Sequence, residues 1–212
     1  MTTTQHAYDS WSSTYDTVEN RTHDLEARAV RAQVTGASYG RIIELGCGTG
    51  KNTAWLAART EHLTAVDFSE AMLAQAQAKN PGRNVEFWLA DISQPWEFAN
   101  PESADLITCS LILEHVADLD FVFRQAARAL TPGGHFYVGE LHPFKQYLGS
   151  KARFTAPDGT TQTLTCYVHH LTDYAQAAQR AGLRVEELRE WFDDDERQEP
   201  PRIVGWMFRK GG

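Results

Sequence analysis

Short β-prone runs alternate with segments of helical periodicity along this chain, and that alternation restricts its fold more than any other feature of the sequence. Strands that alternate with helices form a parallel sheet with helices on both faces. Right-handed crossovers then bring the carboxyl ends of the strands to one edge of the sheet, where a ligand is expected. The pattern predicts strands over 41–45, 62–68, 84–91, 104–110 and 135–141, and helices over 51–59, 69–79 and 119–130.

The residues before the first strand are expected to form a helical cap. Tyr8, Trp11 and Tyr15 recur at helical spacing, and a second helical segment follows them. Residues 1–40 are therefore predicted to pack as helices near the edge where the ligand lies.

An insertion follows the fifth strand. Within residues 142–170, a Pro-Asp-Gly turn signal at 157–159 lies between two β-prone arms, which predicts a hairpin that forms a lid over the sheet edge. A helix over 171–183 and closing strands over 184–192 and 202–210 are expected after it.

Charge and cysteine content narrow the partners and the compartment. The chain has 212 residues and a net charge of −8, which disfavours nucleic acid because phosphate contacts need clustered cations. Its three cysteines are scattered, and it shows neither a secretory signal nor an apolar run long enough to span a membrane. A single cytoplasmic domain over residues 1–212, with no membrane partner, is expected.

The glycine-rich stretch "ELGCGTGKN" follows the first strand directly, and three kinds of site compete for it. A P-loop requires a glycine where Leu45 stands and a hydroxyl where Asn52 stands. A dinucleotide fingerprint needs its third glycine one residue after Gly50. Both phosphate-binding patterns are therefore incomplete, and a G-x-G-x-G turn preceded by an acidic residue remains.

This turn resembles motif I of the class I methyltransferases that use S-adenosylmethionine. "LTAVDFS", "LADI", "LITCSLILEHV" and "ARALTPGGHFYV" follow in the order and spacing of that family's later motifs. The resemblance implies a doubly wound, mostly parallel seven-stranded α/β sheet whose last strand is antiparallel. It also implies S-adenosylmethionine as cofactor and S-adenosylhomocysteine as product.

The resemblance assigns cofactor contacts residue by residue. Asp67 would accept hydrogen bonds from both ribose hydroxyls, as a cis-diol requires of a carboxylate. Asp91 and Ile92 would contact the adenine, whose other face Phe68 and Met72 would line. The full expected set is Tyr15, Glu44, Gly46, Cys47, Gly48, Asp67, Phe68, Met72, Asp91, Ile92 and Cys109.

A small-molecule acceptor is favoured, methylated on O, N or S and able to carry a carboxylate. The Asn/Asp-Pro-Pro-aromatic motif of enzymes that methylate base amino groups is absent after the fourth strand, where "CSLI" stands. Cys109 lacks the preceding proline of the cytosine-C5 enzymes, since Thr108 stands there. A catalytically silent protein that binds the cofactor as a sensor or partner subunit is the alternative, and a nicotinamide oxidoreductase is disfavoured by the glycine spacing.

Candidate catalytic and acceptor residues come from the cap and the insertion. His142 is the preferred base, because an imidazole with a pKa near ~6.5 suits proton removal at neutral pH. Glu140 would share its face, and His115 would line the pocket; a purely structural role for either histidine remains open. No metal-ligand spacing occurs, so no metal is expected. The predicted acceptor contacts are Tyr8, Trp11, Tyr147, Arg153 and His169.

Overall fold

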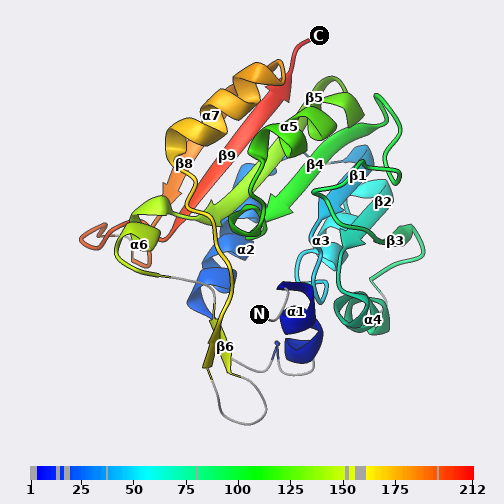
Figure 1. The fold of residues 1–212 in the computed structure, drawn as a ribbon. Helices are drawn as coiled ribbons and strands as arrows, with labels where there is room; N and C mark the ends of the chain where they lie inside the picture. The colour runs from blue at the N-terminus through cyan, green and yellow to red at the C-terminus, as the bar shows by residue number, and fades with distance from the viewer. Residues whose placement is uncertain are drawn as a thin grey trace.

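A twisted seven-stranded sheet forms the centre of the computed structural model, which describes residues 4–12, 15–16, 20–36, 38–79, 81–150, 153–155, 161–194 and 196–212. The strand order is β3-β2-β1-β4-β5-β9-β8 (Figure 1). Only β9 runs antiparallel to its neighbours, so the predicted doubly wound sheet is confirmed. The strands are β1 (Tyr39–Leu45), β2 (Thr60–Asp67), β3 (Val85–Leu89), β4 (Ala104–Ser110), β5 (Leu130–Leu141), β8 (Leu183–Trp191) and β9 (Ile203–Lys210).

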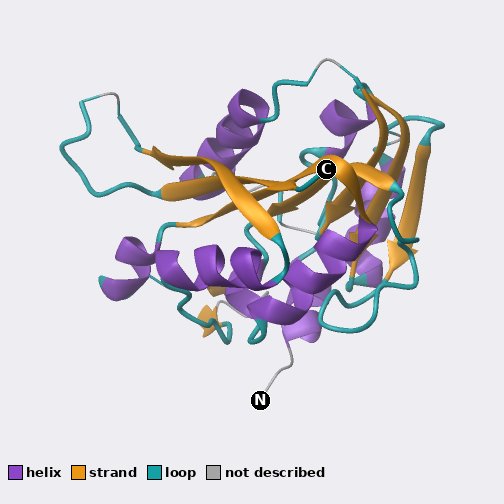
Figure 2. Ribbon diagram, turned by 90° about the horizontal axis from the view of Figure 1, so that it is seen from above, coloured by secondary structure: helices purple, strands orange, loops and turns teal. Residues whose placement is uncertain are grey.

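Helices cover both faces of this sheet (Figure 2). One face carries α2 (Arg21–Gln33), α3 (Thr53–Ala57) and α4 (Glu70–Ala78), and the other carries α5 (Leu119–Ala129) and α7 (Leu171–Arg180). A short helix, α1 (Thr4–Trp11), lies beside α4 at the carboxyl edge of the sheet (Figure 1). Among the described residues, no helix is long and apolar enough to cross a membrane.

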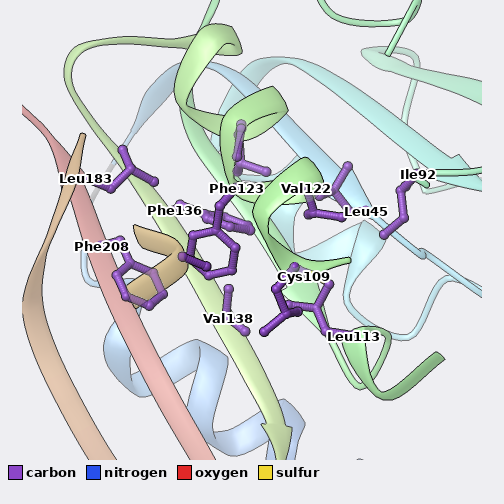
Figure 3. Packing of buried hydrophobic residues seen from close by; sticks show 14 of the residues in the cluster. Leu45, Ile92, Cys109, Leu113, Val122, Phe123, Phe136, Val138, Leu183 and Phe208 are labelled. Carbon is purple, nitrogen blue, oxygen red and sulfur yellow. The ribbon is translucent and has the colours of Figure 1, made fainter. Parts of the chain in front are cut away.

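Alternating strand residues build a separate core on each face. Towards α5 and α7, Phe136 and Phe208 each meet Phe123 edge to face at 5.2 Å between ring centroids, within a cluster that also holds Cys109 and Val138 (Figure 3). Towards α2 and α3, the residues one position along each strand pack together, including Ile42, Leu106 and Tyr137. Two dry faces hold the sheet rigid, so its edge is a fixed platform for side chains.

Local sequence signals set most element boundaries. Ser69 is the N-cap of α4, because its Oγ accepts a hydrogen bond from the Met72 amide at 3.1 Å. The fifth strand was expected over 135–141, but β5 already begins at Leu130 and includes the sequence "TPGG". Gly133 has a φ of +80° there, and the register with β4 shifts between Ala104 and Leu106. This irregularity lets the strand accommodate a proline that has no amide hydrogen.

The insertion after β5 contains the expected hairpin and a helix that was not expected. A short helix, α6 (Pro143–Tyr147), comes first, and β6 (Arg153–Thr155) then pairs antiparallel with β7 (Thr161–Thr163). The predicted turn at 157–159 lies outside the described residues. An extended segment, residues 164–170, leads from the hairpin to α7 and is called the strap below. Its Leu164 packs against Ala7 of α1, which joins the insertion to the N-terminal helix.

Candidate cofactor and acceptor site

A cavity of about 250 Å³ opens at the carboxyl edge of the sheet, on either side of the point where the strand order reverses between β1 and β4. Ligands of doubly wound folds bind at this switch point. The loops after β1, β2, β3 and β4 all contribute to its wall, as do α1 and α2. Its lining includes every residue that the sequence proposed for the cofactor except Cys109: Tyr15, Glu44, Gly46, Cys47, Gly48, Asp67, Phe68, Met72, Asp91 and Ile92.

The glycine turn after β1 forms the floor of this cavity. Gly46 and Gly48 have φ values of +65° and +53°, a region that side-chain-bearing residues rarely occupy. A Cβ on Gly46 would lie 2.2 Å from Cδ1 of Ile112, whereas a Cβ on Gly48 would enter open space. The Ile112 side chain therefore covers Gly46, whereas at Gly48 a ligand can approach bare backbone without meeting a side chain.

Asp67 holds a buried carboxylate at the end of β2. Its Oδ2 accepts a hydrogen bond from the Gly48 amide at 2.8 Å, and its Oδ1 accepts one from the Ser69 amide at 2.9 Å. The side chain is almost fully buried, and this burial raises the pKa of Asp67 above its ordinary value. Each oxygen keeps a further lone pair, so the carboxylate can accept two more hydrogen bonds from a ligand.

Asp91 lies at the far end of the cavity, beyond β3. Its Oδ1 accepts hydrogen bonds from the amide and the hydroxyl of Ser93, at 2.8 and 2.7 Å, which fixes the turn after the strand. The neighbouring Ile92 is buried and adds an apolar surface. This end therefore offers a flat apolar contact beside a polar rim, as a heterocyclic base requires.

Glu44, the acidic residue before the glycines, is buried beneath the turn. Its Oε2 accepts a hydrogen bond from Thr53 Oγ1 at 2.7 Å. Burial raises the pKa of Glu44 to about 8, so the carboxyl group is largely protonated at neutral pH. Its hydrogen bond ties β1 to the first turn of α3 and fixes the loop between them.

Comparison with known proteins agrees with this geometry. Residues 43–138 match the family model described as a methyltransferase domain. An uncharacterized methyltransferase of Emericella nidulans is 29% identical over 215 residues, covering 84% of this chain and 75% of that protein. A ubiquinone biosynthesis O-methyltransferase of Marinobacter nauticus is 35% identical over 107 residues, which cover 48% of this chain and 44% of that protein.

A crystal structure of an S-adenosylmethionine-dependent methyltransferase from Mesorhizobium loti has the same fold. Its TM-score is 0.74 at 24% identity, and the match covers 90% of this chain and 100% of that one. The chain contains a methyltransferase domain and has the fold of S-adenosylmethionine-dependent methyltransferases. The cavity fits this cofactor, because a Cβ on Gly48 would project into it and because Asp67 offers a buried acceptor suited to a diol.

The roof over the cavity has three parts: α1 and the turn after β4, which line the cavity, and the strap, which is bonded to that turn but is not among the lining residues. The turn after β4 contains a single 3-10 turn, η1 (Leu113–His115). The Tyr8 hydroxyl lies 2.9 Å from Nε2 of His115, and Nδ1 of His115 lies 3.1 Å from the Thr165 carbonyl oxygen. Because a carbonyl can only accept, Nδ1 carries the proton and Nε2 accepts from Tyr8. One imidazole thus connects all three parts of the roof.

Polar contacts also hold α1 over the loop after β2. Gln5 Nε2 donates to the Phe68 carbonyl oxygen at 2.8 Å, and Ser69 Oγ donates to Asp9 Oδ1 at 2.5 Å. The Tyr8 ring meets the Phe68 ring edge to face, with centroids 5.8 Å apart. The N-terminal helix therefore covers the cavity through side-chain contacts at its margin.

His169 does not reach the cavity, which corrects its prediction as an acceptor contact. It is buried, and its Nε2 donates to the carbonyl oxygens of Leu113 and Val116 at 3.1 and 2.8 Å. A strap amide, that of Tyr167, donates to the Glu114 carbonyl oxygen at 2.7 Å. These bonds fasten the strap to η1, so His169 positions His115 instead of touching a substrate.

Glu140 and His142 are also corrected, because neither is among the residues that line the cavity. Glu140 Oε1 accepts from the amides of Ile112 and Leu113, both at 2.9 Å, and burial raises its pKa to about 8. His142 is the N-cap of α6, and its Nε2 lies 3.1 Å from Glu190 Oε1. With both ring nitrogens engaged, His142 is a structural histidine, not a base over the cavity.

Four further predictions depend on where side chains point. Cys109 is fully buried in the core towards α5 and α7, because its neighbours Thr108 and Ser110 take the cavity side of β4 (Figure 3). Tyr147 is exposed, and its hydroxyl lies 2.7 Å from Nδ1 of His170, away from the cavity. The side chains of Trp11 and Arg153 lie outside the described residues.

Several lining residues were not proposed from the sequence, and Glu26 is the charged one that is most deeply buried. Glu26, on α2, is 2% exposed and faces the cavity. Its signal was present, because it shares the buried helical stripe of Leu25, Ala29 and Val30, where a charged side chain has no reason to be.

Proposed function

We propose that this methyltransferase acts on a small molecule, with His115 as the base that removes a proton from its O, N or S atom. The cofactor, when bound, would supply a methyl group on its sulfonium. The acceptor atom attacks the methyl carbon directly, and S-adenosylhomocysteine leaves. The observation that carries the proposal is the Tyr8–His115 hydrogen bond in the wall of the cavity. Residues of the chain have to align the acceptor, exclude water and receive its proton.

The tautomer of His115 suits it to that task. Its Nδ1 proton is held by the Thr165 carbonyl, which leaves the Nε2 lone pair directed towards Tyr8. Burial raises the pKa of Tyr8 well above its ordinary value, so Tyr8 stays a neutral phenol that donates to Nε2. An acceptor that enters between them can donate its own proton to Nε2, or pass it through the Tyr8 hydroxyl.

The lining charges favour a neutral or cationic acceptor. Carboxyl groups of Glu26, Asp67 and Asp91 face the cavity, and the ammonium of Lys51 is paired with Asp24 at 2.5 Å. An acceptor carboxylate would therefore depend on Arg153, whose side chain lies outside the described residues. The named role of the Marinobacter nauticus relative, in ubiquinone biosynthesis, also supports a small hydroxylated acceptor.

For the cofactor, we assign the ribose to Asp67 and the adenine to the loop of Asp91 and Ile92. Gly46 and Gly48 would lie beneath the sulfonium, where the backbone at Gly48 is bare. Phe68 and Met72 supply the remaining apolar wall beside the adenine.

An acceptor screen with S-adenosylmethionine labelled in its methyl group tests the proposal. Phenols, alcohols, amines, thiols and carboxylates are offered singly, and transfer of label to at least one of the first four is expected. His115→Gln should abolish that transfer while S-adenosylhomocysteine still binds. Binding of the cofactor without transfer to any member of the panel would favour the silent sensor or partner subunit instead. Transfer to nucleic acid or protein substrates alone would overturn the small-molecule assignment.

A further inference from the structure

The carboxylate of Glu26 is surrounded by donors yet has no catalytic use in the proposed acceptor chemistry. Asn52 Nδ2 donates to its Oε2 at 3.2 Å, and the Tyr137 hydroxyl donates to its Oε1 at 3.3 Å. The hydroxyl of Ser110, at the end of β4, donates a further hydrogen bond. A shell made only of donors orients an ionised carboxylate and leaves lone pairs for a ligand.

The fold keeps space open for this carboxylate. Gly139 of β5 lies beside it, and a Cβ at that position would come within 2.7 Å of Glu26 Oε1 and 2.5 Å of the Tyr137 hydroxyl. Any larger residue at 139 would therefore displace the carboxylate or its donor. Glu26 thus has a built position in the cavity wall.

No cation of the described residues is paired with the Glu26 carboxylate, although the charge of Arg31 acts to lower its pKa. Among the described residues Glu26 forms no ion pair, and the guanidinium of Arg31 donates to Asn52 Oδ1 at 3.0 Å without reaching the carboxylate. Burial lowers the pKa of the nearby His23 to about 4, so this imidazole is neutral. Burial also raises the pKa of Glu26 to about 7. A cationic group of a ligand would offset the cost of this buried charge.

Glu26 lies at one end of the cavity, and Asp91 lies at the other. The strand order places the loop after β3, with Asp91, beside the loop after β2, with Asp67. The ends of β1 and β4 follow, and Ser110 at the end of β4 contacts Glu26. An extended cofactor with its adenine near Asp91 therefore directs its amino-acid end towards Glu26. That end carries the only ammonium group of the molecule.

We propose that Glu26 binds the α-ammonium of S-adenosylmethionine and so selects cofactors that have an intact amino-acid end. The inference rests on the proposed orientation of the cofactor, with its ribose at Asp67. Asn52 and Tyr137 are positioning residues that hold the carboxylate in place.

Calorimetric titration with two ligands tests this role. S-adenosylhomocysteine has the amino-acid end, whereas 5′-methylthioadenosine keeps the adenosine and the sulfur but lacks that end. Glu26→Gln should weaken binding of S-adenosylhomocysteine about tenfold or more, because a charge-assisted hydrogen bond is lost. Binding of 5′-methylthioadenosine should change by less than about twofold, because this ligand has no amino-acid end to contact residue 26 in either the unsubstituted protein or Glu26→Gln.

A matched control variant is Glu140→Gln. Glu140 is also fully buried with a pKa of about 8, but it is not among the residues that line the cavity. It should leave the affinity ratio of the two ligands unchanged. Thermal unfolding of each variant checks the fold. If Glu26→Gln does not fold, Glu26→Asp replaces it. This variant keeps the charge on a shorter side chain and should retain part of the preference for S-adenosylhomocysteine over 5′-methylthioadenosine.

The outcomes separate this inference from the proposed function. Equal weakening of both ligands by Glu26→Gln, or no weakening of either, would overturn the role of Glu26. Asp67→Asn should weaken both ligands, because both contain the ribose. If Asp67→Asn weakens neither ligand, the proposed orientation of the cofactor fails. If it weakens both while Glu26→Gln leaves their ratio unchanged, only the Glu26 inference fails.

Discussion

The floor and the roof of the cavity are built by different means. The floor, comprising the glycine turn, Asp67 and the loop of Asp91, is fixed by backbone amides within or next to each loop. The roof joins Tyr8, His115 and Thr165, which come from three distant segments of the chain, through side-chain hydrogen bonds. A floor of this kind is set by local geometry, whereas the roof depends on tertiary contacts. We therefore expect substitutions in the floor to weaken cofactor binding and substitutions in the roof to slow methyl transfer, each without the other effect.

The largest effect is expected from the roof. His115→Gln keeps a side chain of similar size but removes the basic nitrogen, so kcat should fall about 100-fold or more. The dissociation constant of S-adenosylhomocysteine should stay within about twofold, because His115 is not assigned to the cofactor. Single-turnover rates with the acceptor found in the screen, together with calorimetry, measure the two quantities.

His142→Gln is the matched control for that variant. His142 contacts Glu190 and the Phe144 amide and does not line the cavity, so kcat should be unchanged across pH 6–9. A loss of activity in His142→Gln as large as in His115→Gln would contradict His115 as the sole base and favour His142, which follows β5.

A floor variant should show the opposite pattern. Asp67→Ala removes the proposed acceptor of the ribose hydroxyls and leaves the Gly48 and Ser69 amides without a partner. S-adenosylmethionine should bind about 100-fold more weakly, while single-turnover rates at saturating cofactor should change by less than about threefold. Unchanged affinity would remove Asp67 from the ribose site.

A smaller effect is expected where the strap is fastened. His169→Ala leaves the carbonyl groups of Leu113 and Val116 buried without their donor, which should cost about 1–3 kcal/mol and lower the melting temperature by about 2–10 °C. The ratio kcat/KM for the acceptor should fall, because η1 carries His115. If cofactor affinity fell while kcat/KM held, the separation of floor and roof would be wrong.

The effect that separates the floor from the roof least is a dependence of stability on pH, to which buried carboxyl groups near both contribute. Burial raises the pKa values of Glu26 to about 7 and of Glu44 and Glu140 to about 8. These groups keep protons in the folded state that the unfolded chain has lost, so the free energy of unfolding should fall as pH rises from about 4.5, where the unfolded carboxyl groups ionise, to about 8, where the folded ones do. Urea unfolding of the cofactor-free protein measures this slope. Glu44→Gln should flatten it, and a slope of the opposite sign would contradict the assignment.

The floor could be predicted from the sequence because its signals are local. A strand that ends in glycines or in Asp67 places those residues at the sheet edge once parallel topology is inferred. Ser69 caps α4 through the hydroxyl and spacing visible in the sequence. The face of the sheet on which Cys109 lies was predicted wrongly, because adjacent residues of a strand point to opposite faces. On β4, no polar residue lies on the core face to fix which residues point into the core.

The roof could not be predicted in the same way. His115, His142 and His169 are alike in sequence, and only their partners separate them: Tyr8, Glu190 and the carbonyl groups of η1. Those partners are 53 to 107 residues away for His169 and His115. The unexpected α6 took His142 as its N-cap, which removed it from the strand face it was expected to share with Glu140.

The position of α1 sets an order of events during turnover. Gln5 and Asp9 fasten this helix to the loop after β2, directly beside the cofactor cavity. We therefore expect the cofactor to exchange only when those contacts open. The first bond is exposed, the second is part-buried, and neither lies in the two cores of the sheet, so we expect α1 to lift while the sheet and its cores stay intact. We expect the methylated acceptor to leave first and S-adenosylhomocysteine to leave last. The opening of one short helix would then limit the rate of turnover.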